Sequence, residues 1–162
     1  MATPTYIPLA SVTLAAESPQ VSFTSISQDY SDLVLMIEIK GGQGKVRFNG
    51  DSSGNYNTVY TYNYTPPGTA FGSGANTNST QFGTETGSAT VANLSKMEIF
   101  DYSATDKQKS ILMHNARAGG IQTVVAGRWA DTDAITSITV DINSNNFAVG
   151  SSFKLFAIHG EA

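Results

Sequence analysis

Hydrophobic and polar residues alternate with a period of two along most of the chain. The clearest case is residues 33–40, where aliphatic residues occupy every odd-numbered position but the alternate positions grade from apolar to charged, as Val34, Met36, Glu38 and Lys40. Successive side chains of a β-strand point to opposite faces of the sheet. The pattern therefore predicts a strand that is covered on one face and increasingly wetted on the other.

The next segment, Gly41-Gly42-Gln43-Gly44, has the composition of a turn, and alternation resumes in residues 45–48. Two alternating runs separated by a short glycine-rich segment are typical of a β-hairpin. We expect these two strands to pair with each other.

Alternation of the same kind predicts further strands before and after this pair, at 6–15, 21–26, 97–102, 108–115, 121–129, 135–142 and 152–159. Apolar residues do not recur at helical spacing over more than a turn or two. Many short strands without crossover helices favour antiparallel pairing. We predict an all-β fold, with residues 1–162 forming one antiparallel β-sandwich or jelly roll of about eight to ten strands.

Residues 50–90 depart from this rhythm, because Gly, Asn, Ser and Thr dominate them and Pro66-Pro67 lies in their middle. They are predicted to form one long loop insertion, a kind of segment that often carries contacts. Tyrosine offers a large contact area at a low entropy cost, so four tyrosines in this segment are candidate interface residues. These are Tyr56, Tyr60, Tyr62 and Tyr64. A strand at the sandwich rim and a sugar-binding face are the alternatives.

Residues 1–8 are predicted to form an extended N-terminal arm. Pro4 and Pro8 restrict the backbone to extended conformations, and Tyr6 lies between them. Such an arm could tether the domain to a partner or add a strand to the partner's sheet. Pro4, Tyr6 and Pro8 are therefore also candidate interface residues.

Composition narrows the classes of partner and site. Charged residues make up 14% of the chain, the net charge is −4, and the nine Lys and Arg residues are scattered, which argues against nucleic acid as a partner. The absence of cysteine excludes disulfides, thiolate zinc sites and a cysteine nucleophile. No apolar run is long enough to span a bilayer, and the N-terminus lacks a signal-peptide pattern, so we expect no membrane partner and retention in a cytosol.

The candidate chemistry is sparse. No complete Gly-x-Ser-x-Gly elbow, phosphate loop or distinctive pair of carboxylates occurs. His114 and His159 lie in separate predicted strands and are expected to be packed or at the rim, whereas Trp129 is expected in the core. The run Asp51–Asn55 resembles a calcium loop, but the twelfth position is Tyr62 rather than Glu, so a turn is predicted. We expect no enzymatic activity, no cofactor and no metal.

Several framework segments resemble a family of small tailed-phage virion proteins. They are residues 23–26, 30–35, 46–51, 98–102, 125–129, 135–139 and 145–151, and the C-terminal half matches best. Phe156 and Ala157 depart from the family's usual Tyr and Gly. The resemblance implies a jelly-roll-like sandwich that often assembles as a homotrimer.

The resemblance leaves two functions open. One is a capsid decoration or cement protein, which would bridge capsomers on the virion surface after assembly in the bacterial cytoplasm, with the major capsid protein and further copies of itself as partners. The other is a tail-fibre or receptor-binding module that recognises host surface glycans through the tyrosine-rich segment. The free-standing chain without coiled-coil heptads favours the first.

Overall fold

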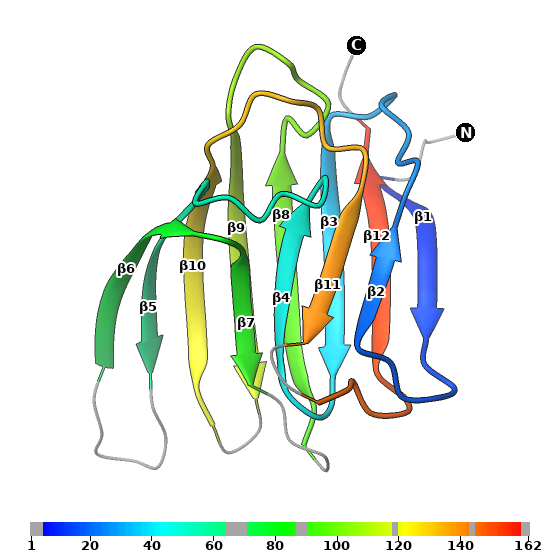
Figure 1. The fold of residues 1–162 in the computed structure, drawn as a ribbon, viewed down its shortest axis with the longest axis vertical. Coiled ribbons are helices and arrows are strands. Elements are labelled where there is room, and N and C mark those ends of the chain that lie inside the picture. Colours follow the sequence, from blue (N-terminus) through cyan, green and yellow to red (C-terminus); the bar gives the residue numbers. More distant parts are fainter. Residues whose placement is uncertain (1–4, 64–70, 87–90, 118–119, 143–144, 160–162) are drawn as a thin grey trace.

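The computed structural model describes residues 5–63, 71–86, 91–117, 120–142 and 145–159, and these form an antiparallel β-sandwich without helices (Figure 1). The larger sheet contains, in spatial order, β1 (Tyr6–Thr13), β12 (Ser152–Ile158), β3 (Asp32–Ile39), β8 (Asn93–Phe100), β9 (Lys109–Arg117), β10 (Gln122–Trp129), β5 (Tyr56–Asn63) and β6 (Phe71–Ser79). The smaller sheet contains β2 (Gln20–Phe23), β11 (Ile138–Ile142), β4 (Gln43–Phe48) and β7 (Phe82–Thr86).

The all-β antiparallel sandwich is confirmed. The number of strands in the described residues is twelve, which exceeds the predicted eight to ten. The jelly-roll arrangement is not confirmed, because the strands are divided eight to four between the two sheets.

The predicted hairpin of residues 33–40 and 45–48 is wrong, although both strands exist. β3 pairs with β12 and β8 in the larger sheet, whereas β4 pairs with β11 and β7 in the smaller one. Gly41 lies between them with a φ of 112°, and a Cβ there would come within 2.8 Å of the Asn146 carbonyl oxygen. This left-handed glycine lets the chain pass from one sheet to the other instead of turning back.

The predicted loop insertion at 50–90 is also wrong, since this region contains β5, β6 and β7. β5 and β6 form an antiparallel hairpin that extends the larger sheet beyond β7, at the left of Figure 1. Tyr, Thr and Val in β5 favour a strand, but Gly and Asn in β6 do not. Pairing along β5 outweighs this weak propensity in β6.

The predicted N-terminal arm overlaps the first strand. Tyr6, Ile7 and Pro8 pair with Ile158, Ala157 and Phe156, so they belong to β1 at the edge of the larger sheet. Proline is tolerated there because an edge strand leaves one row of backbone groups unpaired. Only residues before β1 could still act as an arm, and Pro4 lies outside the described residues.

The core lies between the inward faces of the two sheets, and the small sheet covers only part of the large one. Phe82 of β7 reaches across this interface to Gly127 of β10, where a Cβ would come within 2.7 Å of the Phe82 ring. The same Cβ would lie 2.9 Å from Ile111. Because Gly127 has no side chain, the Phe82 ring of the small sheet can pack directly against the backbone of β10 in the large sheet.

We expect Gly127→Ala to destabilise the fold by about 1–3 kcal/mol, because both contacts are with packed core side chains. Gly83→Ala is the matched control in β7, since its Cβ would meet nothing closer than Gln43 at 3.5 Å. Removing a glycine from a strand without a clash should be neutral or stabilising by about 0.5–1 kcal/mol. Denaturant unfolding of both variants measures the difference; equal stabilities would show that Phe82 does not depend on this space.

Candidate functional site

The β5–β6 hairpin begins at a cluster of four aromatic side chains that join the sheets. Tyr56 and Trp129 stack with ring centroids 6.5 Å apart, and Phe48 and Phe82 pack against them at centroid distances of 4.9–6.2 Å. All four side chains are buried. The first residue of the hairpin is thus held in the core.

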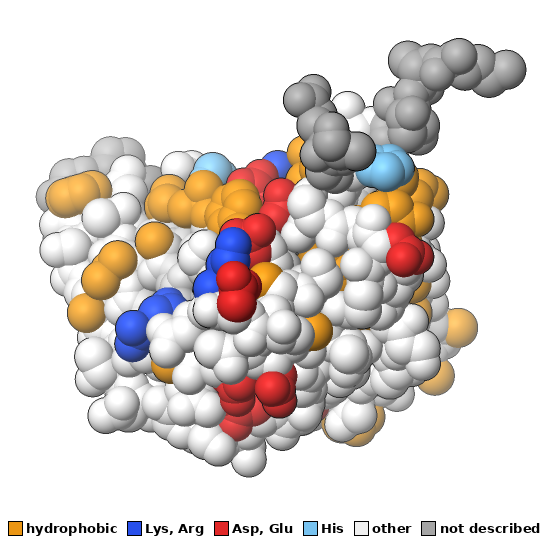
Figure 2. Space-filling view, turned by 90° about the horizontal axis from the view of Figure 1, so that it is seen from above, with side chains coloured by type: hydrophobic (Ala, Val, Ile, Leu, Met, Phe, Trp, Pro, Cys, Tyr) orange, Lys and Arg blue, Asp and Glu red, His pale blue; other side chains and the backbone are white. Residues whose placement is uncertain are grey.

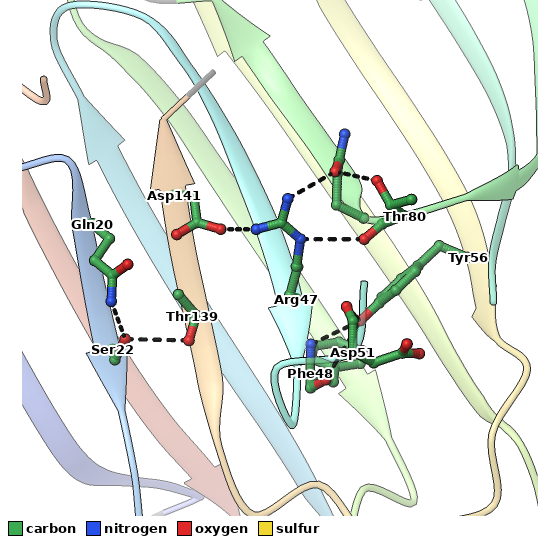
Figure 3. A network of polar contacts seen from close by, with 10 residues as sticks. Gln20, Ser22, Arg47, Phe48, Asp51, Tyr56, Thr80, Thr139 and Asp141 are labelled. Atoms are coloured by element: carbon green, nitrogen blue, oxygen red, sulfur yellow. Dashed lines mark hydrogen bonds and ion pairs between the residues drawn. The ribbon is translucent and has the colours of Figure 1, made fainter. Parts of the chain in front are cut away.

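Hydrogen bonds fix the polar atoms of this cluster (Figure 3). The Tyr56 hydroxyl accepts from the Phe48 backbone N–H at 3.0 Å and donates to the Asp51 carbonyl at 3.2 Å. Burial raises the pKa of Tyr56. The phenol therefore stays protonated, so it can both donate and accept a hydrogen bond.

The Asp51 carboxylate binds three donors: Trp129 Nε1 at 2.7 Å, the Ser53 backbone N–H at 2.8 Å and Asn55 Nδ2 at 3.0 Å. Burial by itself would raise the pKa of Asp51, but these hydrogen bonds together outweigh it and lower the pKa. The segment that resembled a calcium loop is a turn whose carboxylate is engaged by protein donors.

A cationic side chain, Lys109, is buried beside Trp129. Lys109 donates through Nζ to the carbonyl oxygens of Lys107 and Thr132 at 2.8 and 3.0 Å, and Nζ lies 6.0 Å from the Trp129 ring centroid. Desolvation lowers the pKa of Lys109, while nearby carboxylates, Asp131 foremost, act in the opposite direction. The lysine ties two loops together at the end of the sandwich.

Further along the hairpin, two tyrosines of β5 lie over glycines of β6. Tyr60 is opposite Gly74 and Tyr62 opposite Gly72. A Cβ on either glycine would come within 2.5 Å of the phenol end of its tyrosine, so the rings occupy the space above the glycines. The two rings are tilted to each other at a centroid distance of 6.3 Å. This cover explains how a glycine-rich edge strand is kept in place.

A polar groove separates this hairpin from the edge of the smaller sheet. It has a volume of about 380 Å³ and lies beside β7, with Tyr60 and Asn76 on the hairpin side and Gln43 and Gln81 on the other. Its floor includes Asn115 and Thr123 of the large sheet. The groove exists because the hairpin continues past the last strand of the small sheet.

Several walls of the groove are fixed by hydrogen bonds. Gln43 Nε2 donates to the Thr84 carbonyl at 2.8 Å, and Gln81 Oε1 accepts from Arg47 Nη2 at 3.2 Å. Arg47 also binds Asp141 and the Thr80 carbonyl, which links the β6–β7 turn to the smaller sheet (Figure 3).

The outer face of the larger sheet carries most of the exposed hydrophobic side chains. Every large hydrophobic side chain that is exposed in the described residues lies on this face except Val149; the others are Tyr6, Met36, Val59, Phe71, Leu94, Phe100 and Val124. Hydrophobic side chains gather at the upper left of Figure 2, whereas most of that view is neither hydrophobic nor charged. Apolar groups are therefore concentrated on one face.

Part of this face is a nearly continuous apolar surface over β10, β5 and β6, which we call the outer patch: Val59, Phe71, Ala75, Val124 and Ala126. Ala126 pairs with Val59, and Val59 pairs with Ala75, so these three form a row across the strands. Val59 is 60% exposed and Phe71 76%. A shallow hollow of about 590 Å³ lies over this row and Val124.

The tyrosines predicted as one interface group have different positions. Tyr56 is buried in the core, so the prediction that it is an interface residue is wrong. It is the first residue of β5, and its side chain points inward between the sheets. Tyr60 and Tyr62 are half-buried and lie on the same face of β5 as Tyr56. Tyr64 lies outside the described residues. At the opposite edge of the sheet, Tyr6 is exposed and packs edge-on against Phe156.

Sequence reasoning missed the groove and the outer patch because their residues come from strands far apart in the chain. The sequence holds one indication of the groove. Asn115 follows Ile111 and Met113 at the alternate positions of β9 that face the core, where an apolar residue would be expected. A polar residue in a core phase marks a position where hydrogen bonding matters more than apolar packing.

Metal-binding and membrane-spanning features are not found in the described part of the chain. It holds no group of three or more His, Cys, Asp or Glu side chains that could bind a metal ion. His114 is exposed on the outer face, and His159 packs edge-on against Tyr30 at 5.8 Å. None of the described segments forms a helix with the length and hydrophobicity needed to cross a membrane.

Comparisons with known proteins include a structural likeness to a fungal enzyme. No protein-family model and no curated protein matches the chain. Among solved structures, the fold is similar to the exo-inulinase from Aspergillus awamori, with a TM-score of 0.41 and 9% sequence identity. The likeness covers 94% of this chain but 29% of that one.

The hydrogen bonds of Asp51 predict a pH-dependent contribution to stability. Since its folded-state pKa is lowered, the stabilisation is present above the unfolded value near 4 and is lost as the pH falls through the folded value. We expect Asp51→Asn to lower the free energy of unfolding by about 1–2 kcal/mol at pH 7. The loss should shrink on acidification, because the wild type then loses the same interaction.

Unfolding curves between pH 7 and pH 2 test this prediction. Asp106→Asn, at an exposed position, is the control and should follow the wild type. An Asp51→Asn profile parallel to the wild type would show that this carboxylate does not contribute.

Proposed function

We propose that this chain is a structural protein of a phage virion, namely a decoration or cement protein that binds the head shell and bridges capsomers. The proposed partners are further copies of the chain in a homotrimer and the major capsid protein, on the capsid surface of particles assembled in the bacterial cytoplasm. The proposal contains no catalytic step, cofactor, nucleic acid or membrane.

The outer patch is the observation that supports this proposal best. Apolar side chains that adjoin one another on one face of a monomer are typical of surfaces that bind another protein. The rest of the surface is rich in uncharged polar groups, and interfaces of this kind combine an apolar centre with a polar, hydrated rim. In a trimer, three such patches would act together, so each needs only modest affinity.

The framework resemblance to tailed-phage virion proteins supports the virion context. The alternative function, a tail-fibre module that recognises host glycans, is favoured by one feature: the polar groove beside Tyr60. Both functions are binding functions, and they differ in how many copies a particle needs.

Quantitative mass spectrometry of purified particles of the phage that encodes this chain separates the two. A shell repeats its capsomer junctions by symmetry, so a decoration protein should be present in on the order of hundreds of copies. A tail module should be present in a handful. Absence of the chain from purified particles would contradict both.

The outer patch makes a second prediction. The double variant Val59→Lys/Val124→Lys should reduce occupancy on decorated particles by at least tenfold, because two charges would have to be desolvated at the contact. Both side chains are exposed in the isolated chain, so the free energy of unfolding should change by less than about 0.5 kcal/mol per site.

Gln20→Lys, which places a charge at an exposed position of the smaller sheet, is the matched control and should keep full occupancy. Normal occupancy of the double variant would exclude the outer patch as the contact. Particle-bound and free fractions can be separated by sedimentation.

A further inference from the structure

Asn115 is a buried polar residue in the lining of the groove beside β7. Its side chain is 4% exposed, and its Oδ1 has no hydrogen-bond partner within the part of the chain that the structure describes. Leaving a buried acceptor unsatisfied costs about 1–3 kcal/mol. A fold that carries such an atom on the floor of an open groove is suited to a donor that arrives from outside.

The groove around Asn115 has the size and chemistry of a small-ligand site. Its volume of about 380 Å³ falls within the range of about 300–1,000 Å³ typical of ligand pockets. Most of its lining side chains are hydroxyls and carboxamides, and Val125 is the one aliphatic contributor among the described residues. A ligand that fits would carry several hydroxyl or amide groups rather than an apolar body.

Tyr60 adds an aromatic surface to this polar lining. It is half-buried, its phenol end rests over Gly74, and it is part of the groove wall. A ring held in this way offers an amphipathic contact at a low entropy cost. Aromatic rings combined with carboxamides suit a pyranose, which has apolar C–H faces and hydroxyls around its edge.

Among the residues that the structure describes, Lys45 is the one charged side chain in the lining of the groove. It is half-buried, and none of the described acidic residues forms an ion pair with it. A cation at the rim favours a ring that carries a carboxylate. We propose that the inter-sheet groove binds a saccharide unit, with Asn115 as a buried hydrogen-bond acceptor, Tyr60 as the stacking surface and Lys45 at the rim. This inference does not depend on the proposed role in the virion.

A titration followed by two-dimensional ¹H–¹⁵N NMR tests the site on the intact chain. The probes are methyl α-glucoside, methyl α-galactoside, N-acetylglucosamine and glucuronic acid at up to about 20 mM, which detects dissociation constants in the millimolar range. At least one probe should shift the side-chain amide signals of Asn115 and Asn76 and the backbone signals of β7. Glucuronic acid should lose affinity in Lys45→Gln, while the neutral sugars should not.

Variants separate binding from folding. Asn115→Ala should weaken binding at least tenfold without loss of stability, because it removes an unsatisfied acceptor. Tyr60→Leu should weaken binding to a similar extent. Tyr62→Leu is its matched control, since it uncovers a β6 glycine in the same way but does not line the groove.

Three results would overturn the proposal. The first is the absence of shifts with every probe, which would mean that the groove holds water only. The second is an equal loss of binding in Tyr60→Leu and Tyr62→Leu. The third is a response of the β7 amides to the extended peptide Thr-Val-Thr-Val-Thr-Val and not to any sugar, which would assign the groove to strand addition.

Discussion

The packing of Phe82 against Gly127 is the contact on which the arrangement of the two sheets depends. It seats a ring from the edge strand of the small sheet directly on the backbone of β10. Tyr56 and Phe48 pack against that ring, and Trp129 packs against both of them. Backbone groups and Asp51 bind the polar atoms of Tyr56 and Trp129. Because interiors are close-packed, this cluster sets both the separation of the sheets and the place where β7 ends its cover of the large sheet.

The unequal size of the sheets then creates two surfaces with different chemistry. On the inner side, β5 and β6 continue past β7, so inward-facing positions that would otherwise be core become the wall of a groove. These positions carry Thr58, Tyr60 and Asn76 rather than aliphatic residues. On the outer side, the same strands carry Val59, Phe71 and Ala75. Beyond Tyr56, the inward positions of the hairpin are thus polar or amphipathic rather than aliphatic, whereas the inward face of a sandwich strand is normally apolar.

The fold class could be predicted from the sequence, whereas strand pairing and the site could not. Alternation identifies strands such as β3 and β9 because it reports burial on one face. Alternation carries no information on which strand pairs with which. The pattern around Gly41 therefore predicts a hairpin turn, although the chain passes there from one sheet to the other. The composition of residues 71–79 predicts a loop, because their own glycines disfavour a strand. The tyrosines that cover these glycines belong to the neighbouring strand. Cross-strand compensation of this kind is invisible to local propensity.

The lack of aliphatic residues on the inward side of the hairpin is difficult to explain by stability alone. A purely structural hairpin would gain from apolar residues on the inward side, as β3 and β12 carry them. Asn115 continues the polar inward surface into β9, where it costs stability because its Oδ1 is unsatisfied. On the neighbouring strand, Asn93 is also buried, and its Nδ2 donates to the Ser95 hydroxyl at 3.1 Å within the sandwich. Of these two asparagines, Asn115 is the one that lines the groove, so its side chain lies next to the place where a ligand would bind.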